Sequence, residues 1–369
     1  MTDTLTPPKA GRGTWRVTWS GITLIAALEL RQRVRSTRWK WALGVFAGIV
    51  ALVTFLTAGA VASFAFGESY DIPFGIIVYF VLGLGLVVSP TLSATTINGD
   101  NREGTLAPVQ ATAMSAIDIS LGKLLGAWCA SLAFLAVALP FIVFAYVQSD
   151  MPFGAVLVTV IVLALELLAV CGIGLGWSAI TVRTAASAVL TYVSVAALTV
   201  ISLIVFGLLM PVVSQQSTVR VYAPTSYESD GSPTECTVTE QTYEQLHTEQ
   251  VWWLLAMNPF VIVADAAPSK DDNVVGNTGG QTMLGTIKYG VRSARLGPSG
   301  FENQCWDPAT GGTVSHPEDQ ERYDQLSAMP PVWPWGLAFH ALLAGGGVWL
   351  AVRRLGVPHG KLAASTRIA

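Results

Sequence analysis

Charged side chains are scarce in this chain of 369 residues: Asp, Glu, Lys and Arg together make up 12% of it, while apolar residues make up 52%. Soluble domains carry about 25% charged residues. Most of this chain therefore needs no hydrated face, and we predict that it lies in lipid. The formal net charge of −3 excludes a generally basic protein, so no nucleic acid is expected as a partner.

Signatures of catalysis are missing as well. The two Gly-Lys pairs, Gly122–Lys123 and Gly360–Lys361, are both followed by Leu, so the chain has no Walker A loop. It also has no GxSxG, HExxH or Rossmann glycine pattern. His247 and His316 do not have the spacing of a metal site. We expect no enzyme activity, no catalytic residue, no metal site and no cofactor bound by this chain.

Long apolar runs dominate what is present. About 20 consecutive apolar residues cross a bilayer as a helix, and lipid offers the backbone no other hydrogen-bond partner. Six runs qualify: Trp41–Phe66, Ile72–Ile97, Ile119–Val147, Gly154–Ile180, Ala186–Val213 and Val332–Val352. The segment before them lacks a short apolar core with a cleavage site, so we expect the first span to serve as an uncleaved insertion signal.

The positions of Lys and Arg predict the orientation of these spans. Basic residues gather before the first span, between the second and third, and after the last; the short loops on the other side hold Glu68, Asp71 and Asp150 but no Lys or Arg. By the positive-inside rule, both termini are cytoplasmic. The abundance of Arg, Ala, Val and Gly is typical of GC-rich bacteria, so we expect a multi-pass protein of a bacterial cytoplasmic membrane.

We therefore predict an all-α membrane protein with six transmembrane helices, an N-terminal amphipathic interfacial helix, and a mixed, loop-rich extracytoplasmic domain between helices five and six. The predicted divisions are 1–40 (cytoplasmic basic tail and interfacial helix), 41–213 (spans one to five), 214–330 (extracytoplasmic domain), 331–352 (span six) and 353–369 (cytoplasmic tail).

The interfacial helix is predicted within Gly13–Lys40, where Trp, Ile and Leu alternate with Arg. Such a helix would lie on the lipid headgroups. A solvated basic tail that only sets the orientation is the alternative, although such a tail has no need of the apolar stretch from Gly21 to Leu30.

The region 214–330 is acidic, with 6 basic and 15 acidic residues, or 6 − 15 = −9. It holds two of the chain's four cysteines, Cys236 and Cys305, while Cys129 and Cys171 lie in predicted spans. Because both outer cysteines would share one oxidising compartment, we predict a disulfide between them.

One apolar stretch in this region, Val251–Ala267, is short and interrupted by Pro259. As a full span it would move the basic C-terminal end outside, so we favour an interfacial or re-entrant helix with Trp252 and Trp253 at headgroup level. A core helix of the outer domain is the alternative.

Two further features lie inside the spans. Glu166 is an acid near the middle of the fourth span, and such a residue either lines a pathway or subunit interface or is a protonated or hydrogen-bonded packing residue. The small residues Gly172, Gly176 and Ala344–Gly347 predict close packing between helices.

The loop between spans two and three carries a charged start, Arg102-Glu103-Gly104-Thr105-Leu106, followed by Val109 and then by Ser115 and Gly122-Lys123. This segment resembles the "(R/K)EGTL…LS…GK" loop of type 2 ABC exporter permeases. Pro108-Val109 and Ala113-Met114 stand where the family usually has a Leu pair and Thr-Pro. The resemblance extends to the six spans, the interfacial helix and the Asn258-Pro259-Phe260 string.

In that family, two permease subunits, identical or different, face each other above two ATP-binding subunits that hold ATP and Mg. The resemblance implies an efflux permease whose loop 98–117 contains the coupling helix. By this analogy, Arg102, Glu103, Gly104, Thr105, Leu106 and Val109 contact the ATPase, and Arg183 is a second contact. The alternatives are a membrane sensor or scaffold whose outer domain binds a ligand or partner, and a gradient-driven transporter that uses Glu166.

Overall fold

The computed structural model describes residues 15–64, 72–105, 109, 114–149, 153–227, 233–267, 283–307 and 312–356. This described part of the chain is mostly helical and has six helices that are long and apolar enough to cross a membrane, as expected of a multi-pass membrane protein. These are α2 (Thr37–Phe64), α3 (Ile72–Ser93), α6 (Ala116–Val147), α7 (Phe153–Ile180), α14 (Trp333–Leu355) and the continuous run of α8 (Thr184–Ala196), the π-helical turn η1 (Ala197–Ile201) and α9 (Ser202–Leu209).

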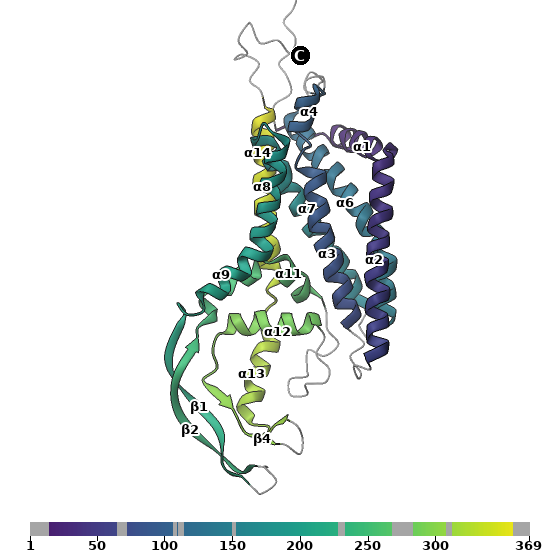
Figure 1. The fold of residues 1–369 in the computed structure, drawn as a ribbon. Helices are drawn as coiled ribbons and strands as arrows, with labels where there is room; N and C mark the ends of the chain where they lie inside the picture. The colour runs from purple at the N-terminus through teal and green to yellow at the C-terminus, as the bar shows by residue number, and fades with distance from the viewer. Residues whose placement is uncertain are drawn as a thin grey trace, which may run out of the picture.

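Two shorter helices, α1 (Trp19–Arg35) and α4 (Asn98–Glu103), lie at one end of this bundle, here called the α1/α4 end (Figure 1). The opposite end, here called the sheet end, carries the elements of the region 214–330. They are β1 (Ser214–Tyr227), β2 (Pro233–Leu246), η2 (Thr248–Gln250), α10 (Trp253–Ala256), α11 (Pro259–Ala266), α12 (Met283–Leu296), β3 (Phe301–Asn303), β4 (Trp306–Asp307), β5 (Gly312–Thr313) and α13 (Pro317–Ala328).

Helix α1 runs across the end of the bundle before α2 begins (Figure 1). It ends at Arg35, and the extended backbone of Ser36 separates it from α2, which starts at Thr37 rather than at the predicted Trp41. Ile22 and Ile25 are buried on its inner side. A wholly solvated tail therefore does not describe the part of this segment that forms α1.

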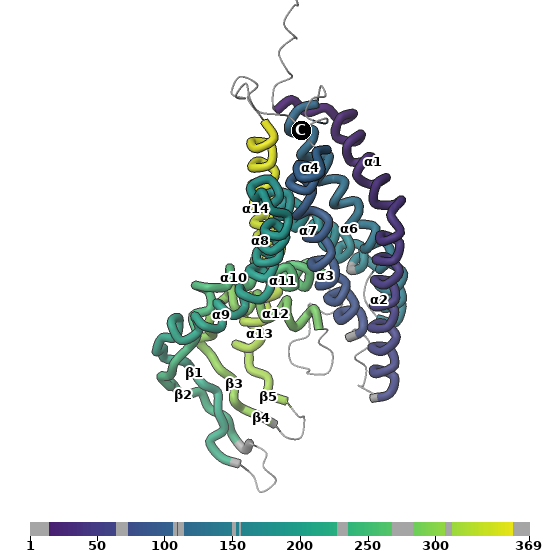
Figure 2. Tube along the Cα trace, turned by 45° about the horizontal axis from the view of Figure 1, so that its top comes forward, coloured from purple at the N-terminus to yellow at the C-terminus, as the bar shows by residue number. Residues whose placement is uncertain are grey.

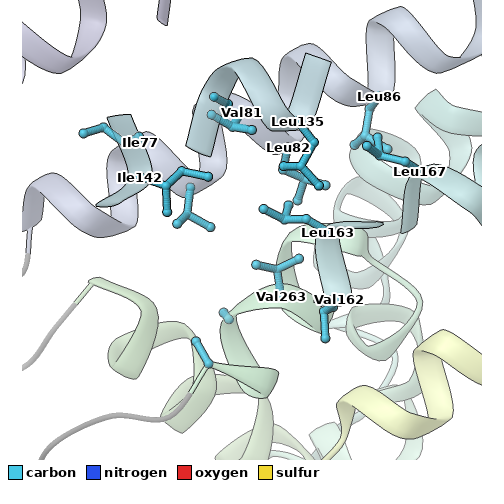
Figure 3. Packing of buried hydrophobic residues seen from close by; sticks show 14 of the residues in the cluster. Ile77, Val81, Leu82, Leu86, Leu135, Ile142, Val162, Leu163, Leu167 and Val263 are labelled. Atoms are coloured by element: carbon cyan, nitrogen blue, oxygen red, sulfur yellow. The ribbon is translucent and has the colours of Figure 1, made fainter. Parts of the chain in front are cut away.

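The main core of the bundle lies between α3, α6 and α7. Figure 3 shows Leu82, Leu135 and Leu163 of these three helices packed together. Helices α7 and α14 approach closely: a Cβ added to Gly176 would lie 2.6 Å from the Cα of Gly347. The predicted close packing at these small residues is confirmed.

At the sheet end, β1 pairs antiparallel with β2 from Ser214 opposite Leu246 to Tyr227 opposite Pro233. The short β3 adds parallel to the other edge of β1, giving the strand order β2-β1-β3. The predicted disulfide between Cys236 and Cys305 is present and joins β2 to the turn between β3 and β4. Among the described cysteines, Cys129 and Cys171 are free.

The stretch Val251–Ala267 forms two short helices, α10 and α11, at the junction between the bundle and the sheet end (Figure 2). Pro259 occupies the first turn of α11, where a proline needs no amide partner. Val263 packs beside Val162 and Leu163 of α7 (Figure 3), and Val261 packs with α12 and Val332. The stretch thus contacts both the spans and the outer region.

Candidate functional sites

The first candidate site is the α1/α4 end, where α4 is tied to the end of α7. The side chain of Asn98 is buried; its Nδ2 donates to the carbonyl oxygen of Thr181 at 3.3 Å, and its Oδ1 accepts from the Ser178 hydroxyl at 3.2 Å. Arg183 lies two residues after Thr181 and is exposed. The structure therefore brings the two loops that the sequence singled out, around residues 102 and 183, to the same end of the bundle.

The exposed tip of α4 carries Arg102 and Glu103. Gly104 ends the helix in the left-handed conformation at φ 73°, which favours glycine. Its backbone N–H donates hydrogen bonds to carbonyl oxygens of α4. Val109 is partly buried against a hydrophobic cluster of the bundle. Leu106, the other apolar residue predicted to dock, lies outside the described residues.

Lys123 of α6 is the centre of a buried ionic cluster beneath α4. Its side chain is 3% exposed, and Nζ donates to Glu29 of α1 at 2.8 Å and also to the carboxylate of Asp100 of α4. Arg33 of α1 lies 3.5 Å from the same Glu29 carboxylate. One lysine thus connects three helices at the α1/α4 end.

The groove on α6 that receives α1 is lined by glycine. A Cβ on Gly122 would lie 2.6 Å from the Cβ of Ile25, so a larger residue there would displace α1. Asp118 accepts from the amide of Thr18 at 2.7 Å and forms a capping box with Ser115. Ser115, Gly122 and Lys123, which the family resemblance singled out, therefore all contribute to holding α1 or α4 against α6.

The second candidate site is a buried polar pair between α7 and α14. Glu166 and His340 are 0% and 1% exposed in their side chains, and His340 Nδ1 lies 2.7 Å from Glu166 Oε2. The other ring nitrogen, Nε2, lies 2.9 Å from the carbonyl oxygen of Met257, in the turn between α10 and α11. Glu166 Oε1 is buried and has no hydrogen-bond partner among the residues that the structure describes.

Further hydrogen bonds hold the α10–α11 stretch in place. Asn258 caps α11, and its Nδ2 donates at 2.7 Å to the carbonyl of Thr199 in the π-helical turn η1. The buried carboxylate of Asp265 accepts from the amides of Val332 and Trp333 at the start of α14 and also pairs with Arg292 of α12 at 2.8 Å. The stretch from Asn258 to Asp265 thus makes contacts at both of its ends.

Sequence reasoning missed His340, Glu29 and Asp100. His340 lies within the sixth predicted span, and an ionisable residue in such a position is itself a signal of a functional site. Glu29 and Asp100 had no such signal, because their partner Lys123 lies far from both along the chain.

The region of the chain that the structure describes contains no group of three or more His, Cys, Asp and Glu side chains that could hold a metal. A comparison with protein-family models found no match, and a comparison with curated proteins also found none.

Proposed function

We propose that this chain is the transmembrane permease subunit of an ATP-driven exporter of the ABC type. In this proposal, the α1/α4 end faces the cytoplasm of a bacterium, the region 214–330 lies outside the cell membrane, and a separate subunit binds ATP and Mg. A second permease, identical or different, completes the pathway. The basic residues of α1 lie on lipid headgroups.

The observation that carries this proposal is the ionic cluster around Lys123, which connects the exposed tip of α4 to the body of the protein. A partner that pushes on Arg102 and Glu103 moves Asp100, and through Lys123 it also moves α6 and α1. The contacts of Asn98 pass the same movement to α7 and to the loop that carries Arg183. A short helix with exposed charges and buried anchors is suited to transmitting force.

Co-purification tests the class of protein. The full chain is purified in mild detergent from its own host, and associated proteins are identified by mass spectrometry. Recovery of a protein with a Walker A loop supports the exporter. Recovery of a histidine kinase or a lipoprotein without an ATPase would instead support a membrane sensor or scaffold.

Charge reversal tests the role of α4. Because Glu103 is exposed at the tip, Glu103→Lys is expected to lower the ATPase activity of the complex several-fold while the variant still inserts in the membrane. Glu240→Lys is the matched control, since Glu240 is exposed on β2 at the sheet end. Unchanged activity in the Glu103 variant would refute the assignment.

A second function, gradient-driven transport, is favoured by the buried Glu166–His340 pair, because paired ionisable residues within spans are typical of proton pathways. Transport into vesicles with ATP supplied distinguishes the two. Transport that survives an uncoupler supports the ATP-driven exporter. Transport that the uncoupler abolishes supports a gradient-driven transporter.

A further inference from the structure

The imidazole of His340 lies between two acceptors, and this fixes where its protons are. The carbonyl of Met257 can only accept, so Nε2 carries a hydrogen. At Nδ1, one proton is shared with Glu166 Oε2: either a neutral carboxyl donates to the ring, or a protonated ring donates to the carboxylate. Both arrangements give the pair a net charge of zero, which suits a buried site.

The second oxygen of Glu166, Oε1, is buried, and no described residue hydrogen-bonds to it. A second proton on the pair gives a protonated ring beside a neutral carboxyl, whose hydroxyl would then lie at Oε1. In the closed structure this form is costly, because it buries a net charge and leaves a donor without an acceptor. Water at the pair removes both costs.

The α10–α11 turn is held against this pair by close packing as well as by the hydrogen bond. Gly336 lies one helical turn before His340 on α14, on the same face. A Cβ on Gly336 would lie 2.0 Å from the carbonyl oxygen of Ala256, so only glycine permits this approach. The turn therefore covers the pair, and its release would expose Glu166 and His340.

The ionisable groups on the surrounding elements have other partners or lie elsewhere. On α11, Asp265 pairs with Arg292 of α12. On α3, Tyr79 donates to the carbonyl of Phe260. The remaining groups are at a distance along their own helices: Cys171 on α7, Arg353 and Arg354 at the far end of α14, Asp118, Lys123, Cys129 and Tyr146 on α6, and Tyr192 on α8.

From this arrangement we infer that Glu166 and His340 form a proton-binding latch: the neutral pair holds the α10–α11 turn in place, and uptake of a second proton accompanies release of the turn. Because the extra proton is stable only when the pair is hydrated, linkage requires that acid favours release. The latch is formed by residues of this chain alone and requires no ATPase partner.

Hydrogen exchange of the full chain in lipid nanodiscs tests the latch. Exchange of the amides in 251–267 is measured at about pH 8 and about pH 5, the range over which histidine charge changes, in the wild type and in Glu166→Gln/His340→Gln. The double variant keeps polar side chains at both positions but cannot titrate. Comparing the proteins at the same pH cancels the intrinsic pH dependence of exchange.

Acidification is expected to speed exchange of this stretch in the wild type relative to the double variant, by at most about tenfold per pH unit for one linked proton. Gly336→Ala is the positive control; it should speed exchange of the stretch at both pH values. Exchange in α3 and α6 reports whether each variant is folded. A wild type and a folded double variant that respond identically to pH would overturn the latch.

Discussion

The two ends of the bundle are held together by different chemistry. At the α1/α4 end, the buried Lys123 pairs with the partly buried Glu29 and Asp100, and glycine on α6 lets α1 approach closely. In the outer part of the sheet end, the ionic contact between Arg220 and Glu318 is solvent-accessible, with the Arg220 side chain 53% exposed. There, a disulfide joins β2 to the turn after β3.

This difference follows from how much apolar surface each end can bury. The bundle has a large core, so a buried ionic cluster at its end has packed helices on several sides. The clusters of buried apolar residues in the outer region are small, so a covalent link contributes more there. Breaking a contact at the α1/α4 end should therefore affect neighbouring helices, whereas breaking one at the sheet end should have a local effect.

Replacing Lys123 is expected to have the largest effect. Lys123→Met removes the cation that Asp100 and Glu29 share, and it leaves Glu29 with Arg33 alone. Breaking a buried ion pair by removing one partner costs roughly 3 kcal/mol or more. Local opening of α1 and α4 should become about a hundredfold more frequent. Hydrogen exchange of amides in α1 measures this.

The control for this variant is Arg102→Met, which removes an exposed charge from the same region and should leave α1 protected. Adding Glu29→Gln to Lys123→Met should restore part of the protection, because one of the two carboxylates that lost Lys123 is removed. If α1 exchanges equally slowly in the wild type and in Lys123→Met, the cluster does not hold α1.

Removal of the disulfide is expected to have a smaller and more local effect. The bridge closes a loop with a sequence separation of 69 residues, for which chain entropy gives an upper figure of about 4 kcal/mol. Cys236→Ser/Cys305→Ser should increase exchange in β1 and β2 while leaving α7 and α14 unchanged. Cys129→Ser is the control. Equal loss of protection in the bundle would show that the two ends are not independent.

The spans could be predicted from the sequence because the signal for them is local. A run of apolar residues predicts a helix wherever it lies, and the six runs match six helices. The boundary between the interfacial helix and the first span was predicted at residues 40–41, whereas the break lies at Ser36. The basic residues around it fit either helix equally well, so they did not give its position. The disulfide could be predicted because only two cysteines lie outside the predicted spans.

The ionic cluster and the buried pair could not be derived in the same way. Glu29 and Lys123 are 94 residues apart, and Glu166 and His340 are 174 apart. Which charges meet depends on how the helices pack, and no periodic pattern along the chain encodes it. Glu166 could be singled out by its position in a span, but its partner and the carbonyl of Met257 required the fold.

The smallest expected effect concerns Tyr243 of β2, which donates a hydrogen bond to the carboxylate of Glu302 on β3. This bond raises the pKa of Tyr243 to about 12. Because the folded pKa lies above the ordinary value, the contribution to stability is complete below about pH 10 and is lost as the pH rises through about 12. The contact is exposed, so its contribution to stability is small.

Absorbance of the phenolate measures this titration directly. The difference in absorbance between the wild type and Tyr243→Phe should show one tyrosine that ionises at a higher pH than a free phenol. In Glu302→Gln, this tyrosine should ionise at a lower pH than in the wild type. Exchange in α1 and α7 should not change in either variant. If Tyr243 ionises at the ordinary pKa of tyrosine, the Tyr243–Glu302 bond does not form. If α1 loses protection, exposed contacts at the sheet end affect the far end of the bundle, and the contrast between the two ends fails.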